Sequence, residues 1–149
     1  MFTSNPFSEL SASIPSQVMQ GYVILMVLLV IGGTVLDMIH KKSAKYFFEN
    51  AKKAKKSAKR TVSTGEKASI AVQVLVNEVL TSGEFCNVKR RLSHLLTMYG
   101  FILFVATTAI MIFAYPTPAT PTPEILPLLW HIGALMLAIG GYWVWCFLL

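Results

Sequence analysis

Residues 21–36, GYVILMVLLVIGGTVL, contain no charged side chain, and the apolar block around them extends over residues 18–40. At about 1.5 Å per residue, a helix of this length crosses the hydrocarbon core of a bilayer, which is about 30 Å thick. A secretory signal peptide is disfavoured, because no cationic stretch precedes the block and no small-residue cleavage site follows it. We therefore expect a membrane-spanning helix here.

Two further apolar blocks occupy residues 92–115 and 125–149, and the proline-rich run PTPATPTPE separates them at residues 116–124. Its four prolines fix φ and lack a backbone donor, so we expect an extended loop that ends both helices. Of the 149 residues, 54% are hydrophobic and 13% are charged, compared with about 25% charged in an average soluble domain. A soluble enzyme is thereby disfavoured, and the expected fold is an all-α membrane protein with three transmembrane helices.

Every Lys and Arg of the chain, thirteen in all, lies within residues 41–91, which also hold four acidic residues and so carry a net charge of +9. The positive-inside rule places such a segment in the cytoplasm. Residues 1–17 and 116–124 are then expected outside, and the carboxyl end of the third helix on the cytoplasmic side. Since no Lys or Arg anchors that end, a complete chain and the front part of a longer protein both stay open.

The first part of this cytoplasmic segment, KKSAKYFFENAKKAKKSAKR at residues 41–60, is rich in helix-forming Ala and Lys and lacks Gly and Pro. We expect a helix that continues from the first membrane span and carries a short aromatic strip at residues 46–48. Such a helix suits anionic lipids or an acidic protein partner, and simple solvation is the third alternative. Nucleic acid is disfavoured, because no base-reading motif accompanies the cations. The candidate binding residues are Lys52, Lys53, Lys55, Lys56, Lys59 and Arg60.

A second cytoplasmic helix is predicted to begin at Ser63, because a hydroxyl followed three residues later by Glu66 is the capping-box pattern. Apolar residues at helical spacing extend this helix over residues 67–81, and the turn at Ser82 and Gly83 ends it. The β-branched run IAVQVLV at residues 70–76 also fits a strand. We expect the helix.

The three histidines are candidate ligands, since neutral imidazole binds haem iron and is otherwise disfavoured in lipid. His40 ends the first predicted membrane helix, His94 begins the second and His131 lies near the start of the third. The expected topology puts His40 and His94 near the cytoplasmic face and His131 near the outer face, so the three cannot bind one iron. A haem held by His40 and His94, and interfacial histidines bonded to headgroups or carbonyls, both remain open.

Other residues of the apolar blocks have structural interpretations. Asp37 lies four residues before Lys41, the spacing of a helical ion pair. The two cysteines, Cys86 and Cys146, form no CxxC pattern, and we expect free thiols. No Walker loop, dinucleotide-binding turn or zinc motif is present in the sequence. Close helix packing is the interpretation for the glycines Gly32, Gly33, Gly133, Gly140 and Gly141.

Two runs in the second half of the chain resemble a family of respiratory membrane subunits. RRLSHLLTMYGF at residues 90–101 resembles the start of a haem-bearing helix in the nitrate reductase gamma-like group, which includes heterodisulfide-reductase-like subunits and the QmoC subunits. LWHIGALMLAIGG at residues 129–141 resembles the next helix of that group. Residues 74–149 as a whole look most similar to the membrane anchors associated with adenylylsulfate reductase in sulfur-oxidising bacteria (AprM type).

The resemblance implies an electron-transfer subunit of a bacterial cytoplasmic membrane that links a soluble flavin and iron–sulfur reductase to the quinone pool. The basic segment would dock that partner. His94 matches the family's haem-ligand position, so haem b, with His94 as its metal ligand, and quinone are the implied cofactors. A second histidine of the family's helix is replaced here by FILF, residues 101–104. A cofactor-free structural subunit of a larger complex and a lipid-sensing regulator are the alternatives.

Overall fold

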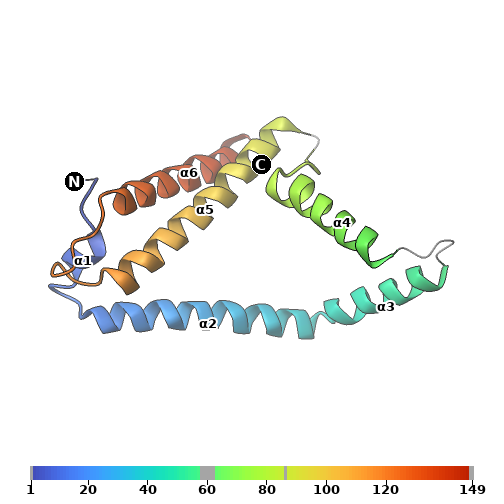
Figure 1. Ribbon diagram of the computed structural model, residues 1–149, viewed down its shortest axis with the longest axis horizontal. Coiled ribbons are helices and arrows are strands. Elements are labelled where there is room, and N and C mark those ends of the chain that lie inside the picture. Colours follow the sequence, from blue (N-terminus) through green and yellow to red (C-terminus); the bar gives the residue numbers. More distant parts are fainter. Residues whose placement is uncertain (1, 58–62, 86, 148–149) are drawn as a thin grey trace. The chain divides into compact units, whose positions relative to one another are not determined.

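The computed structural model describes residues 2–57, 63–85 and 87–147, and in these ranges the chain consists of helices joined by turns and loops (Figure 1). The predicted all-α fold is confirmed. By contacts the chain divides into two compact units, one formed by Met1–Gln20 with Ala71–Leu149 and the other by Gly21–Ile70. The elements in chain order are α1 (Pro6–Leu10), α2 (Ser16–His40), α3 (Ser43–Ser57), α4 (Thr64–Val74), the π-helix η1 (Leu75–Leu80), α5 (Val88–Ala114) and α6 (Ile125–Phe147).

Three helices are long and apolar enough to cross a membrane, as predicted: α2, α5 and Ile125–Cys146 of α6. The protein is thus a multi-pass membrane protein by helix length and composition. α5 begins four residues before the predicted boundary, because the Asn87 side chain accepts a hydrogen bond from Lys89 N at 2.9 Å and caps the helix. The short helix α1 lies within residues 1–17, where the sequence pattern indicates no element.

α5 and α6 form an antiparallel hairpin closed by the proline loop (Figure 1). Near one end Ser93 Oγ donates to Gly140 O at 2.9 Å, and near the other Trp130 Nε1 donates to Thr108 Oγ1 at 2.9 Å. The residues of α5 that face α6 recur in alternating steps of four and three, which is the spacing of the contact face of a coiled coil. Small residues on such a face, or seam, let membrane helices approach closely. The residues of α5 with this spacing that are buried or contact α6 are Ser93, Thr97, Gly100, Phe104, Thr107 and Met111.

Gly100 and Gly133 lie where the two helix backbones approach each other closely. A methyl carbon at Gly100 would lie 2.8 Å from Leu137 N, and one at Gly133 would lie 2.8 Å from Phe104 N. Gly140 is confined in the same way by the backbone of α5. The packing predicted for Gly133 and Gly140 is therefore confirmed. Within the described ranges, a methyl carbon would meet no atom closer than 4 Å at the other three predicted packing glycines, Gly32, Gly33 and Gly141.

The amino-terminal segment is held on the loop between α5 and α6. Asn5 is only 4% exposed, and its side-chain oxygen caps α1 by accepting from Phe7 N at 3.0 Å. Its Nδ2 donates to Tyr115 O and to Thr122 Oγ1, each at 3.0 Å. One side chain thus begins a helix and ties it to the loop, and both polar atoms of this buried amide have hydrogen-bond partners.

A second tie joins the start of α2 to the end of α5. The carbonyl of Ile112 would normally accept from the amide four residues later, but residue 116 is proline and has no N–H. Gln20 Nε2 donates to Ile112 O at 3.1 Å and replaces the missing donor. The sequence thus compensates within the same unit for the proline that ends α5.

α2 and α3 are separate helices, so the predicted continuous helix over this junction is wrong. Lys42 has φ of 54°, in the left-handed region, and its N donates to Ile39 O at 3.1 Å. The new helix starts where Tyr46 N donates to Lys42 O at 3.1 Å. The predicted ion pair is confirmed, with Lys41 Nζ 2.9 Å from Asp37 Oδ1.

The helix predicted to begin at Ser63 and to extend over residues 67–81 is confirmed, and its strand alternative is excluded. Ser63 Oγ accepts from Glu66 N at 3.3 Å, as the capping box requires. α4 then widens into η1, a π-helical stretch that the sequence pattern does not predict. The predicted turn ends it: Ser82 is buried with φ of 50°, and Gly83 N donates to Asn77 O at 2.9 Å.

Candidate functional site

An open pocket of about 380 Å³ lies at the cation-rich end of the α5 and α6 hairpin. We call it the His94 pocket. Its lining combines two apolar side chains, two hydroxyls, a guanidinium and an imidazole, and ligand sites in proteins commonly combine apolar side chains with a few polar groups. The lining residues are Phe85, Arg90, Ser93, His94, Thr97 and Val144.

His94 is exposed on this pocket, and its ring lies 5.1 Å from that of Phe85 at an interplanar angle of 41°. The hydroxyl protons of the two neighbouring residues are already engaged, since Ser93 Oγ donates to Gly140 O and Thr97 Oγ1 donates to Ser93 O, each at 2.9 Å. Among the lining residues that the structure describes, Arg90 and His94 are therefore the side chains that can still donate a hydrogen bond to a ligand.

Three cations, Lys89, Arg90 and Arg91, open α5 at the end where the helix dipole disfavours positive charge. Arg91 is compensated, because its Nε donates to Thr81 O at 2.7 Å. Tyr99 OH likewise donates to Leu80 O at 2.7 Å. These two bonds satisfy carbonyls at the end of η1 and hold that end against α5 beside the pocket.

Glu78 of η1 and Glu84 of the loop before α5 are joined by a hydrogen bond between their side chains. A hydrogen bond with the Glu84 carboxyl raises the pKa of Glu78 above its ordinary value, and partial desolvation and the charge of Glu84 act in the same direction. The exposed pair lies outside the three spanning helices. It gives this loop a pH-dependent contact near the pocket.

His131, the second candidate ligand, is half-buried at the opposite end of the hairpin. Its Nδ1 lies 2.7 Å from Pro127 O, and because a carbonyl only accepts, Nδ1 carries the proton and Nε2 is left as an acceptor. Its ring meets those of Trp130 and Phe2 edge-on, each at 5.0 Å. The ring is therefore fixed mainly by packing and by its own helix.

The histidines of the hairpin do not assemble one haem site. Ser93 is opposite Gly140 while Trp130 is opposite Thr108, which separates His94 from His131 by about 20 Å along the hairpin. His40 belongs to the other compact unit. Among the described residues, no three His, Cys, Asp or Glu side chains gather as a multi-ligand metal site would require. A two-histidine haem in this hairpin would thus need a ligand from outside it.

The predicted basic residues fall partly within the described ranges. Lys52, Lys53, Lys55 and Lys56 lie exposed on α3, whereas Lys59 and Arg60 lie outside the described residues. Of the two cysteines, Cys146 is exposed with a free thiol and Cys86 lies outside the described residues.

Sequence reasoning selects His94 but misses the rest of its pocket. Phe85 and Val144 come from opposite ends of the hairpin sequence, and only the pairing of Ser93 with Gly140 brings them together. The seam spacing of small residues in the two helices is the signal that could have given this register. Comparison with protein-family models, curated proteins and solved structures finds no match to this chain.

Proposed function

We propose that this protein is a membrane anchor and electron-transfer subunit that links a soluble cytoplasmic oxidoreductase to the membrane quinone pool. The observation that carries the proposal is the His94 pocket, a ligand-sized space at the cation-rich end of a membrane-spanning hairpin. Its volume falls within the range of small-molecule sites, about 300–1,000 Å³. The reaction of the soluble partner takes place on that partner.

The chemistry of a quinone headgroup suits this pocket. The flat ring packs between Phe85 and Val144, and its carbonyl oxygens accept hydrogen bonds from Arg90 and His94. Reduction to quinol takes up two electrons and two protons, and the electrons come from the reduced partner. The exposed His94 imidazole relays protons between water and the quinone oxygen.

The cation-rich segment supports the proposed orientation and docking. Residues 41–91 carry a net charge of +9, so the positive-inside rule favours a cytoplasmic segment and an outer amino terminus and proline loop. An acidic face on a flavin and iron–sulfur enzyme would be steered to it. The resemblance noted in the sequence favours an adenylylsulfate reductase-like partner in a bacterial cytoplasmic membrane.

A second candidate function is a cofactor-free structural subunit of a larger membrane complex. The observation in its favour is α2, a candidate spanning helix whose apolar residues are not buried by the other residues of its own compact unit. A helix of this kind offers an apolar surface on which another membrane helix can pack.

The test is a reduced-minus-oxidised absorption spectrum of the affinity-purified protein, together with extraction and quantification of its quinone. We expect flavin and iron–sulfur bleaching from a co-purified enzyme and about one quinone per chain. His94→Ala and Arg90→Gln should each lower the quinone content at least fivefold. His131→Ala, at the far end of the hairpin, is the matched control and should leave it unchanged.

Two outcomes would contradict the proposal. Equal quinone content in His94→Ala, Arg90→Gln and wild-type protein would show that the quinone does not bind in the His94 pocket. A preparation with neither redox signal nor quinone, but with another membrane complex attached, would favour the structural subunit. A b-type α-band near about 560 nm that disappears in His94→Ala would instead make this chain a haem subunit whose second ligand comes from outside the hairpin.

A further inference from the structure

The exposed helix α3 combines aromatic side chains with a cluster of lysines directly after a spanning helix. Phe47 and Phe48 are 69% and 62% exposed, and their rings contact each other at 5.6 Å rather than any other aromatic ring described. α3 has no buried residue. Large apolar side chains this exposed on a cytoplasmic helix indicate a surface that something covers.

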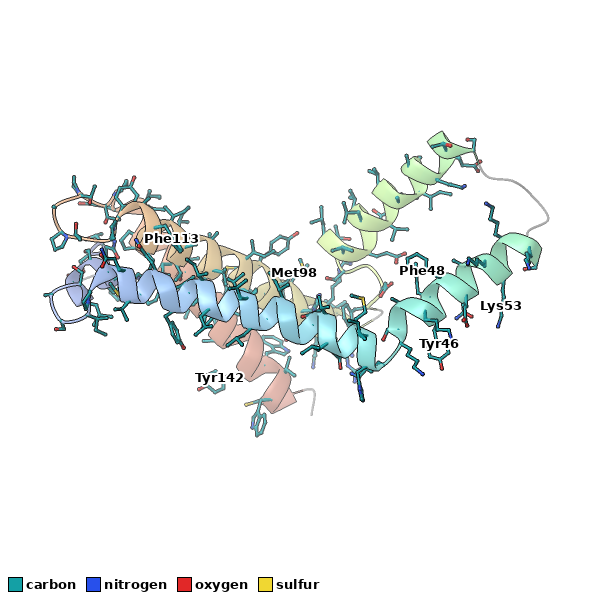
Figure 2. All side chains as sticks on the ribbon, turned by 90° about the horizontal axis from the view of Figure 1, so that it is seen from below. Tyr46, Phe48, Lys53, Met98, Phe113 and Tyr142 are labelled. Carbon is teal, nitrogen blue, oxygen red and sulfur yellow. The ribbon has the colours of Figure 1, made fainter. Side chains whose placement is uncertain are left out.

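The apolar residues of α3 share one face. At about 100° per residue, Ala44, Phe47, Phe48, Ala51 and Ala54 fall within one third of the helix circumference. Figure 2 shows Phe48 on one side of α3 and Tyr46 and Lys53 on the other. α3 is therefore an amphipathic helix, with aromatic residues in its apolar face and cations around the rest.

The charge of α3 is strongly positive. It carries five lysines and one acid, Glu49, which lies 3.8 Å from Lys45. In the part of the chain that the structure describes, no ion pair engages the other four lysines, Lys52, Lys53, Lys55 and Lys56. Lys55 falls on the apolar face in the last turn, where its methylene stem can lie on apolar surface while its ammonium reaches outward.

The junction with α2 permits α3 to leave the direction of the spanning helix. Lys42, which has a left-handed backbone conformation, lies between the end of α2 at His40 and the start of α3 at Ser43. This conformation prevents the helical hydrogen bonds of α2 from continuing into α3. A continuous helix would carry the lysines straight away from the bilayer. A break at this point allows the first turns of α3, with Phe47 and Phe48, to stay at the depth of the headgroups.

We propose that α3 lies in the plane of the membrane interface, with Phe47 and Phe48 inserted among the acyl chains and its lysines bound to the phosphates of anionic lipids. Charge complementarity and the exposed aromatic face, directly after a spanning helix, select this occupant, since a helix with lysines on its polar face and phenylalanines on the other lies in the interface of an anionic membrane. The inference does not use the His94 pocket. It assigns the α3 lysines to lipid and leaves the cations that open α5, Lys89, Arg90 and Arg91, to attract an acidic protein partner.

The test measures the depth of α3 in the full-length protein reconstituted in nanodiscs. In a Cys86→Ser, Cys146→Ser background, a bimane label is placed at Ala51→Cys on the apolar face or at Lys53→Cys, about 160° around the helix. Lipids with a doxyl quencher in the acyl chain should quench the label at position 51 at least threefold more than that at position 53. This contrast is expected with 30% phosphatidylglycerol and should fall in pure phosphatidylcholine.

Charge variants carry the test further. Replacing Lys52, Lys53, Lys55 and Lys56 by Gln in the position 51 background should abolish the dependence on phosphatidylglycerol, because each lysine near an anionic surface favours binding by roughly fivefold. The matched variant with four arginines at these positions keeps the charge and should retain the quenching. Salt at 1 M should reduce the contrast, since the screening length falls to about 3 Å.

Two results would overturn the proposal. Equal quenching at positions 51 and 53 in phosphatidylglycerol discs would show that the apolar face of α3 does not enter the bilayer. The second result has two parts: the quenching is identical in the Gln and Arg variants, and a co-purified protein is lost only from the Gln variant. Together these observations would show that the lysines bind a protein partner and not lipid.

Discussion

Two pairs of glycines in this molecule occupy opposite environments. Gly100 and Gly133 lie at the seam of the α5 and α6 hairpin, where a methyl carbon on either glycine would lie within 3.1 Å of backbone atoms of the facing helix. Gly32 and Gly33 in α2 have open space in place of that contact. The same residue type therefore marks a completed helix interface in one region and an unoccupied surface in the other.

The difference teaches that spacing, rather than the presence of glycine, identifies a helix seam. The seam residues of α5 recur in steps of three and four, and Gly133 and Gly140 of α6 are seven residues apart, which keeps them on one face. Adjacent glycines such as Gly32 and Gly33 lie about 100° apart around the helix axis, so the pair does not define a seam along one face. Four predictions test this contrast and the contacts that border it.

Gly133→Ala should produce the largest effect. The new methyl would meet Phe104 N at 2.8 Å, so the helices must separate and lose packing, at about 1–3 kcal/mol. Unfolding by dodecyl sulfate in bicelles, followed by circular dichroism, measures the change. Gly32→Ala is the matched control, and it should be neutral or stabilise by up to about 1 kcal/mol. Equal destabilisation by both variants would remove the contrast between the two regions.

Asn5→Ala should destabilise the amino-terminal attachment by about 2 kcal/mol, because α1 loses its cap and Tyr115 O loses a buried donor. Hydrogen exchange of residues 2–10 measures this release. Asn5→Asp keeps the cap acceptor but loses both Nδ2 bonds, so it should show an intermediate effect. If Asp and Ala were equivalent, the cap would contribute nothing and the tie to the loop would account for the whole effect.

Ser82→Gly should stabilise the turn before α5 by about 1 kcal/mol. Glycine adopts a φ of 50° without strain, and the substitution removes a buried hydroxyl that has no hydrogen-bond partner among the described residues. Lys42→Gly relieves the same kind of backbone strain but at an exposed residue, so it should stabilise less. Thermal unfolding of the two variants ranks them, and the reverse order would contradict the role assigned to burial.

The pair Glu78 and Glu84 should give the smallest effect, visible as a pH dependence. Because the hydrogen bond raises the pKa of folded Glu78, the contact is fully present below the ordinary carboxyl pKa and is lost as pH rises through the raised value. Carbon NMR of the labelled carboxyl should show a Glu78 pKa that falls towards its ordinary value in Glu84→Gln. If the pKa of Glu78 were the same in that variant as in the wild-type protein, the hydrogen bond with Glu84 would not be the cause of the shift.

Hydrophobic length and helix signals predict most of the fold. Three apolar blocks are long enough to span, the capping residues around Ser63 begin α4, and Asp37 pairs with Lys41 as its spacing requires. The break at Lys42 escapes prediction, because lysine carries no preference for a left-handed backbone. The π-helical η1 escapes for a similar reason, since its sequence also fits an α-helix.

The candidate site is less predictable than the fold. His94 is identifiable as an imidazole at the start of an apolar block, but its pocket depends on the register between α5 and α6. The seam spacing of small residues indicates which faces of the two helices meet, but the pairing of individual residues, such as Ser93 with Gly140, follows from non-local contacts. The role of Asn5 is likewise hidden, because its partners lie more than 100 residues away.

The hydrogen bonds of Asn5 also determine whether the chain crosses the membrane an even or an odd number of times before the proline loop. Asn5 touches Tyr115 O and Thr122 Oγ1 directly, so the start of the chain and the proline loop share one side of the bilayer. A chain that leaves and returns to the same side crosses an even number of times, and among the described residues between Asn5 and Tyr115 the candidate spans are α2 and α5. A crossing by α2 therefore requires a return crossing by α5, whichever leaflet the charges select.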